Sequence, residues 1–158
     1  MKFGIIKERK NPPDRRVVFT PEELVRLQSE HPEAEIKVES SDIRIFSDDQ
    51  YRNLGLNVTT DMTDCDVLFG VKEVPIDALI PNKKYFFFSH TIKKQPYNRK
   101  LLQAILAKNI ELYDHETIVD ATNHRLIGFG RYAGLVGAYN GFRGFGIKYD
   151  LFTLPKAE

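Results

Sequence analysis

The sequence predicts an α/β protein with a mostly parallel open sheet flanked by helices, in a Rossmann-like (flavodoxin-like) arrangement. Short apolar runs rich in Val, Ile and Phe, typical of buried strands, alternate with longer amphipathic segments that are typical of helices. This alternation favours a parallel sheet with helices on both faces, because parallel strands need a crossover between them. With 158 residues, 42% of them hydrophobic, the chain is expected to form one domain with a single core.

Six segments are expected to form the strands of this sheet. Each is a short apolar run bounded by Pro, Gly or polar clusters, which is the pattern of a buried strand. In chain order they are residues 3–6, 35–38, 66–71, 85–89, 110–113 and 126–129.

Three helices are expected between these runs. The first, over about 20–31, begins with Thr20 as a candidate N-cap followed by Pro21 at the first helical position. The second, over 47–55, opens with a serine cap and ends at a glycine. The third, over about 97–108, repeats Leu and Ile at helical spacing. A further helix is expected to open after the run at 126–129.

Composition excludes several classes of function. A net charge of +1 gives no electrostatic reason to expect nucleic acid or an anionic membrane as a partner. No apolar run approaches membrane-spanning length, and the N-terminus does not resemble a signal peptide. The single cysteine, Cys65, suits a reducing compartment, so we expect a cytoplasmic protein. No metal site is expected, because His115 lacks ligand spacing to a second His or Cys.

Two of the expected strands lead into a residue that can carry a proton. The run at 66–71 is followed by Lys72, and the run at 85–89 by His90. Both should lie at the carboxyl edge of the sheet, where ligands of open α/β sheets bind, and such a pair suits acid–base catalysis. The alternative, that charged residues follow strands simply because loops face water, stays open for Lys72. The abrupt change from an apolar run to a single His90 favours a functional histidine.

Two arginines are candidates for binding a substrate carboxylate, since a guanidinium can hold one through two parallel hydrogen bonds. Arg16 follows a loop stiffened by Pro12 and Pro13, and Arg131 follows the expected strand at 126–129.

Residues 128–133 match the G-x-G-x-x-G/A fingerprint of dinucleotide-binding proteins. The fingerprint also requires a following strand that ends in an acidic residue about 20 residues further on. Asp150 has roughly that spacing, but residues 142–149 do not have the pattern of a strand, and the nearby glycines suggest close helix packing instead. We therefore favour other interpretations over nucleotide binding by this segment.

Several segments resemble one known family. The segments 70–75 (GVKEVP) and 85–93 (YFFFSHTIK) are similar to the lysine-forming saccharopine dehydrogenases and the lysine–oxoglutarate reductase domain. These belong to the wider family that shares the alanine dehydrogenase/transhydrogenase N-terminal domain. The segments 6–8 and 16–21 resemble that family's first strand and the arginine segment after it. The resemblance extends from residue 2 to about residue 155.

The resemblance implies roles for individual residues. It identifies Lys72 and His90 as the catalytic acid–base pair. Arg16 matches an arginine near the substrate carboxylate, and two glutamates match acids that tune the pair. The substrate-binding residues that it implies are Arg16, Arg131, Glu73 and Glu116.

The resemblance also implies a domain organisation. Residues 1–150 correspond to a substrate-binding and catalytic N-terminal domain, and residues 151–158 to the start of the connection to a nucleotide-binding domain. In the family that domain follows, and it holds NAD or NADP in the intact enzyme. We therefore expect no cofactor bound to this chain alone.

The favoured hypothesis is the substrate-binding and acid–base half of an NAD(P)-dependent amino-acid dehydrogenase. Its partners would be a small amino-acid or oxo-acid substrate, the nucleotide-binding domain and possible further copies of the chain. The first alternative is a stand-alone ligand-binding module of the same fold without redox activity. A single-domain nucleotide-binding protein that uses residues 128–133 is the second.

Overall fold

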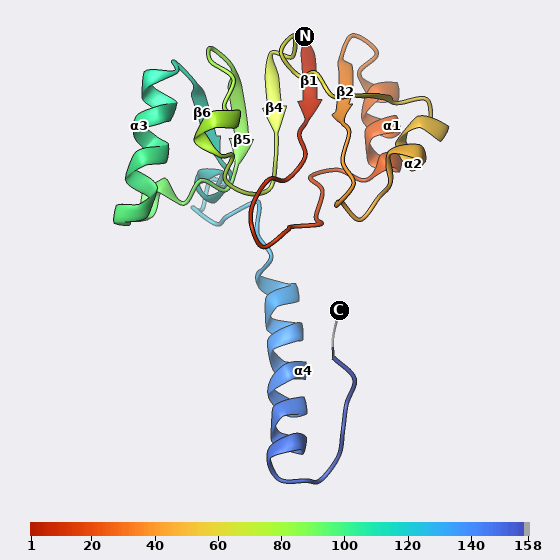
Figure 1. The fold of residues 1–158 in the computed structure, drawn as a ribbon, viewed down its shortest axis with the longest axis vertical. Helices are drawn as coiled ribbons and strands as arrows, with labels where there is room; N and C mark the ends of the chain where they lie inside the picture. Colours follow the sequence, from red (N-terminus) through yellow and green to blue (C-terminus); the bar gives the residue numbers. More distant parts are fainter. Residues whose placement is uncertain (157–158) are drawn as a thin grey trace.

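The computed structural model describes residues 1–156, and its sheet is entirely parallel, as predicted (Figure 1). The strand order is β3-β2-β1-β4-β5-β6, the order of the doubly wound Rossmann sheet. The strands are β1 (Lys2–Ile5), β2 (Glu35–Glu39), β3 (Asn57–Thr59), β4 (Val67–Phe69), β5 (Lys84–Phe87) and β6 (Glu111–Asp114). The α/β class and the parallel sheet flanked by helices are therefore confirmed.

The helices of the sheet domain lie where the sequence predicted them. They are α1 (Pro21–Glu30), α2 (Asp48–Asn53) and α3 (Arg99–Ala107). Capping boxes built on Thr20 and Ser47 start the first two, because each hydroxyl accepts a backbone N–H that the first turn leaves unpaired. Four single 3-10 turns complete the list: η1 (Ile76–Ala78), η2 (Thr91–Lys93), η3 (Pro96–Asn98) and η4 (His115–Thr117).

Two apolar clusters lie on opposite faces of the sheet. On one face, Leu24 of α1 and Tyr51 of α2 pack with Ile5 and Val38 of the central strands. On the other, α3 and η1 pack over alternate residues of β4 and β5, among them Phe87. Figure 1 shows α1 and α2 beside β2, and α3 beside β5 and β6.

The last helix leaves this domain. Helix α4 (Gly130–Lys148) projects away from the carboxyl edge of the sheet, and the chain after it runs back along the helix (Figure 1). The returning segment is fastened by Phe152 stacked on Phe142 and by Arg143, which donates a hydrogen bond to the carbonyl of Leu154. Most side chains of α4 are exposed. Within the described residues, no helix combines the length and the apolar character needed to cross a bilayer.

One strand prediction was wrong, and one strand of the sheet was not predicted. Residues 126–129 form no strand, because after η4 the chain turns back on itself through an isolated antiparallel bridge between Val119 and Arg125 and never pairs with β6. The short edge strand β3 was not predicted, because its Asn-Val-Thr sequence carries no apolar run. Both deviations lie at the periphery of the sheet.

The strand order reverses between β1 and β4, which both leave the sheet at the same carboxyl edge. In open α/β sheets a crevice forms at this switch point, because the two neighbouring strands send their loops in opposite directions. The loop after β1 carries Glu8 and Arg16, and the loop after β4 carries Lys72.

Candidate active site

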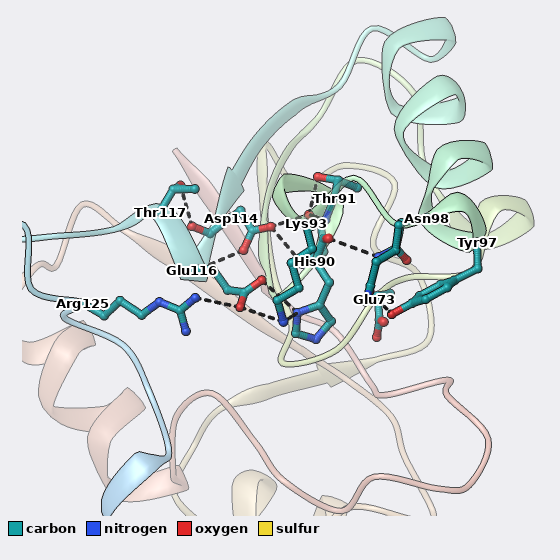
Figure 2. Close-up of polar contacts among 12 residues, drawn as sticks. Glu73, His90, Thr91, Lys93, Tyr97, Asn98, Asp114, Glu116, Thr117 and Arg125 are labelled. Carbon is teal, nitrogen blue, oxygen red and sulfur yellow. Dashed lines mark hydrogen bonds and ion pairs between the residues drawn. The ribbon is translucent and has the colours of Figure 1, made fainter.

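A buried carboxylate, Glu116, organises the cationic side chains at the carboxyl edge (Figure 2). Its Oε2 lies 2.9 Å from Nδ1 of His90, and its Oε1 accepts from Arg125 at 2.9 Å and lies 3.1 Å from Lys93 Nζ. Burial alone would raise the pKa of Glu116, but the hydrogen bonds from His90, Lys93 and Arg125 outweigh it and lower that pKa to about 2. Glu116 is therefore ionised at neutral pH.

Backbone geometry fixes the direction of His90. Its φ of 57° lies in the left-handed region, which a non-glycine residue adopts only when its surroundings enforce it. Asn98 enforces it in part by donating an amide hydrogen bond to the His90 carbonyl at 3.1 Å. Asp114, at the end of β6, accepts from the backbone N–H of both Ser89 and Glu116, at 3.2 Å and 2.8 Å. The Asp114 carboxylate thus connects the loop after β5, which carries His90, to the turn after β6, which carries Glu116.

A second buried carboxylate, Glu8, holds the backbone of the lysine loop. Its two oxygens accept from the N–H groups of Val71 and Lys72 at 2.7 Å and 2.8 Å. Burial is the main influence on this group and raises the pKa of Glu8, although the two backbone hydrogen bonds oppose it. The loops after β1 and β4 are therefore joined across the switch point.

Arg16 is held in place by Asp14 and Phe129. Its Nε donates to Asp14 Oδ1 at 2.9 Å, and its Nη2 lies 2.5 Å from Asp14 Oδ2. The hydrogen bond from Arg16 is the main reason why the pKa of Asp14 is lowered. The guanidinium also lies over the ring of Phe129, 4.6 Å from its centroid. About two-fifths of the Arg16 side chain stays exposed, so part of the fork remains accessible to a ligand.

Some of these residues line one pocket of about 160 Å³. Four of the predicted site residues lie around it: Arg16, Lys72, His90 and Glu116. Phe88 and Phe129 supply its apolar wall. Cationic and acid–base groups therefore converge on one space that is open to solvent, which is the arrangement needed to bind and protonate a small anionic molecule.

Two predicted site residues do not line this pocket. Glu73 lies beside it, where both of its oxygens accept from Lys10 Nζ at 3.0 Å and 2.9 Å. Burial would raise the pKa of Glu73, but the hydrogen bond from Lys10 is the main influence that opposes burial, and the pKa is lowered. Arg131 is exposed in the first turn of α4. The strand expected to present Arg131 does not form, so nothing in the sheet directs this side chain to the pocket.

Sequence reasoning missed Arg125, Lys93 and Glu8. Arg125 lies in a polar stretch that has the composition of a turn, and Lys93 belongs to a run of charged and polar residues after His90. Glu8 is one of four consecutive charged residues, and nothing in their order distinguishes the buried one. All three gain a role only through contacts between residues far apart in the chain or across a loop.

The fingerprint at 128–133 does not form a dinucleotide site in the described residues. The segment before it is irregular, so the strand–turn–helix that cradles a pyrophosphate is not formed. A methyl group added at Gly128 or Gly130 would meet nothing within 4 Å, which shows that neither glycine serves a close backbone approach. The segment therefore does not fit a nicotinamide dinucleotide.

Comparison with known proteins agrees with the fold and the sequence resemblance. The profile of the alanine dehydrogenase/PNT N-terminal domain matches residues 4–136. Alpha-aminoadipic semialdehyde synthase of Arabidopsis thaliana is 35% identical over 147 residues, which are 90% of this chain and 14% of that protein. The mitochondrial alpha-aminoadipic semialdehyde synthase of Bos taurus is 37% identical over 113 residues, 72% of this chain and 12% of that protein. The chain thus spans about a seventh of the length of these relatives.

Solved structures support the same fold. An L-alanine dehydrogenase superposes with a TM-score of 0.62 at 21% identity, over 78% of this chain and 35% of that one. The transhydrogenase of Sinorhizobium meliloti gives a TM-score of 0.60 at 17% identity, over 74% of this chain and 35% of that one. With the family profile covering most of its length, the chain belongs to the alanine dehydrogenase/PNT N-terminal domain family.

Proposed function

We propose that this chain is the substrate-binding and acid–base part of a nicotinamide-dependent amino-acid dehydrogenase of the saccharopine dehydrogenase type. The observation that carries the proposal is the pocket in which Lys72, His90 and Arg16 converge around the ionised Glu116. Saccharopine dehydrogenase of Yarrowia lipolytica is a relative, 29% identical over 109 residues. Relatives of this kind favour a substrate that carries several carboxylates.

In this proposal Glu116 positions His90 rather than reacting itself. Lys93 Nζ and His90 Nδ1 lie 3.1 Å from each other, and both lie within hydrogen-bond distance of the Glu116 carboxylate. Because a carboxylate only accepts, we assign both nitrogens as donors to it, with no hydrogen bond between the two. That assignment leaves Nε2 of a neutral His90 with a free lone pair, as in other carboxylate–histidine pairs. Nε2 can then accept a proton from the substrate and return it.

Lys72 is proposed as the second proton-transfer group. Forming and hydrolysing an imine between an amine and an oxo acid requires protons to move on and off nitrogen and oxygen, so two groups with different proton affinities serve it better than one. The hydrogen bond from the Lys72 N–H to Glu8 fixes where its side chain leaves the backbone. Lys72 and His90 thus approach the same pocket from the loops after β4 and β5.

Arg16 and Arg125 are proposed to hold carboxylates of the substrate. Both line the pocket and both keep about half of the side chain exposed, at 40% and 53%. Their present partners, Asp14 and Glu116, orient the guanidinium groups without using all five donors of either. The redox step and NAD or NADP are proposed to belong to polypeptide outside this chain.

Titration calorimetry of the chain tests this proposal. We expect saccharopine to bind at least ten times more tightly than alanine, because it offers more carboxylates to the two arginines. Arg16→Ala should weaken saccharopine binding by about 1.5–3 kcal/mol, the value of a charged hydrogen bond. Arg26→Gln, which alters an exposed arginine of α1, is the matched control and should bind as the wild type does. Equal binding of saccharopine and alanine, or no effect of Arg16→Ala, would contradict the proposal.

A further inference from the structure

A further hollow lies at the carboxyl edge of the sheet, on the side of α3. Its volume is about 450 Å³, and among the described residues it shares no lining residue with the pocket of the candidate active site. Three segments far apart in the chain form it: 9–11 after β1, 73–76 after β4, and residues between 97 and 101 at the start of α3. We call it the α3 hollow. Its volume lies within the range of small-molecule sites, which is about 300–1,000 Å³.

The lining of the α3 hollow carries an excess of positive charge. The Arg9 guanidinium is held by the carbonyl of Lys7, which lies 2.9 Å from Nη1, and by the buried Glu39 carboxylate, which accepts from Nη2. These contacts use two of its five donors, so three N–H groups remain for a ligand. Lys10 Nζ contacts both oxygens of Glu73, and its side chain is 41% exposed. In all, three cations and one carboxylate line the hollow: Arg9, Lys10, Lys100 and Glu73.

A buried amide also lines the α3 hollow. Asn98 is only 6% exposed, and its Nδ2 donates to the His90 carbonyl at 3.1 Å. Although Asn98 is the N-cap residue of α3, its side chain makes no capping hydrogen bond. The side-chain oxygen and the second amide hydrogen are therefore not used by the helix and are available to a polar ligand group.

Apolar side chains form much of the remaining lining. Val74 and Leu101 are 5% and 8% exposed and form a floor, whereas Ile76 and Tyr97 are 41% and 70% exposed. Covering exposed apolar surface with a ligand is favourable. A ligand with a hydrocarbon body beside an anionic group therefore fits this lining better than an inorganic anion, which would leave the apolar side chains uncovered.

We propose that the α3 hollow binds a small monocarboxylate with a hydrocarbon body, as a second ligand in addition to the substrate of the candidate active site. Its carboxylate would accept from Arg9, Lys10 and Lys100, because guanidinium and ammonium groups form charge-assisted hydrogen bonds with carboxylates. Its hydrocarbon chain would lie on Val74 and Leu101. This binding does not depend on the reaction proposed above.

The α3 hollow borders the candidate active site. In the view of Figure 2, Glu73 and Asn98 lie on one side of His90, and Glu116 lies on the other. A carboxylate that binds Lys10 competes with Glu73 for this ammonium group and adds a negative charge beside the site. Saccharopine is itself anionic at neutral pH, so it should bind more weakly while the hollow is occupied, and linkage makes the effect reciprocal. This coupling, unlike the binding itself, rests on the proposed function.

The test is a titration of the whole chain with sodium hexanoate at constant ionic strength, followed by ¹⁵N–¹H NMR. We expect the backbone N–H resonances of the three segments that form the hollow to shift. Hexan-1-ol, which has the hydrocarbon body without the charge, should bind about tenfold more weakly or worse, since it lacks the charged hydrogen bonds. Lys10→Gln and Lys100→Gln should each weaken hexanoate binding about fivefold. Arg99→Gln removes a neighbouring exposed cation that does not line the hollow, so it is the matched control.

Three results would each overturn the proposed site. If hexan-1-ol binds as tightly as hexanoate, the hollow does not recognise a carboxylate. If Arg99→Gln weakens binding as much as Lys100→Gln, hexanoate responds only to the general positive charge of this surface. If the shifts centre on the candidate active site and Arg16→Ala abolishes them, hexanoate binds there instead. The unshifted resonances of each variant show whether it is folded, and the side chains of Lys10 and Lys100 are exposed enough for substitution.

The coupling is tested by titrating saccharopine at increasing hexanoate concentrations. We expect its affinity to fall by about twofold to fivefold and then to stay constant, because two separate sites interact with a finite coupling free energy. A fall that continues without limit would show direct competition, and the hollow would then be part of the substrate site rather than a second one. An unchanged saccharopine affinity would exclude the coupling. If saccharopine does not bind at all, the proposed function fails, and the hexanoate titration still decides the α3 hollow.

Discussion

Replacing Glu116 by glutamine removes the negative charge that His90, Lys93 and Arg125 share. The pKa of Glu116 is lowered from 4.5 to about 2, and a shift of that size corresponds to at most about 3.4 kcal/mol of stability. Lys93 and Arg125 are 44% and 53% exposed, so water screens part of their attraction. We therefore expect Glu116→Gln to lower the free energy of unfolding at pH 7 by about 1–2 kcal/mol.

The effect should depend on pH in one direction. Because the folded pKa of Glu116 lies below the unfolded value, its stabilisation is complete above pH 4.5 and is lost as the pH falls towards 2. Urea unfolding followed by circular dichroism should show that the difference between wild type and Glu116→Gln at pH 3 is less than half of that at pH 7. Glu33→Gln makes the same charge change at an exposed site and should alter stability by less than about 0.5 kcal/mol. An equal loss at both pH values, or no loss, would refute the ion-pair network.

Three further predictions concern catalysis and packing. In a full-length dehydrogenase that contains this domain, Lys72→Met and His90→Gln should each lower kcat by about 10²–10⁴-fold, whereas Arg16→Ala should act mainly on KM. A wild-type kcat for Lys72→Met across the pH range would end the acid–base assignment. The isolated chain should reduce neither NAD nor NADP with saccharopine or alanine, and turnover above a heat-inactivated control would contradict this. Gly4→Ala should destabilise the fold by about 1–3 kcal/mol in urea, because its Cβ would lie 2.7 Å from a leucine methyl. Gly141→Ala, on an open helix face, should not destabilise it.

The central strands of the sheet could be predicted from sequence because each is a short apolar run that is recognisable without knowledge of its neighbours in the fold. The apolar runs at β4 and β5 lie between polar clusters, and their side chains are buried or half-buried, so they carry a strong signal. The run at 126–129 has the same local signal but no partner strand, and pairing is a property that a single segment does not encode. Strand β3 shows the opposite case, since pairing with β2 creates a strand where the local pattern is weak.

The residues of the candidate site also fall into two groups, those whose position could be predicted from the local sequence and those whose position could not. The placement of Lys72 and His90 could be predicted because each lies three residues after the end of a strand, and all parallel strands end at one edge. Arg125 could not, because it reaches Glu116 only through the turn of the chain between η4 and α4. Arg131 was predicted as a site residue because it follows an expected strand at 126–129. That strand does not form, so the reason for placing Arg131 at the carboxyl edge no longer holds.

The contact of Glu8 with two successive backbone N–H groups makes it a crosslink between the halves of the sheet. In a doubly wound sheet the two halves meet only along β1 and β4, and the loops above that seam diverge. A carboxylate that grips Val71 and Lys72 from the β1 side removes that freedom without any covalent bond. The backbone that carries the Lys72 side chain is therefore held by both halves of the sheet. Thermal motion of one half relative to the other would carry the lysine along with it and would leave its position towards the β1 loop unchanged.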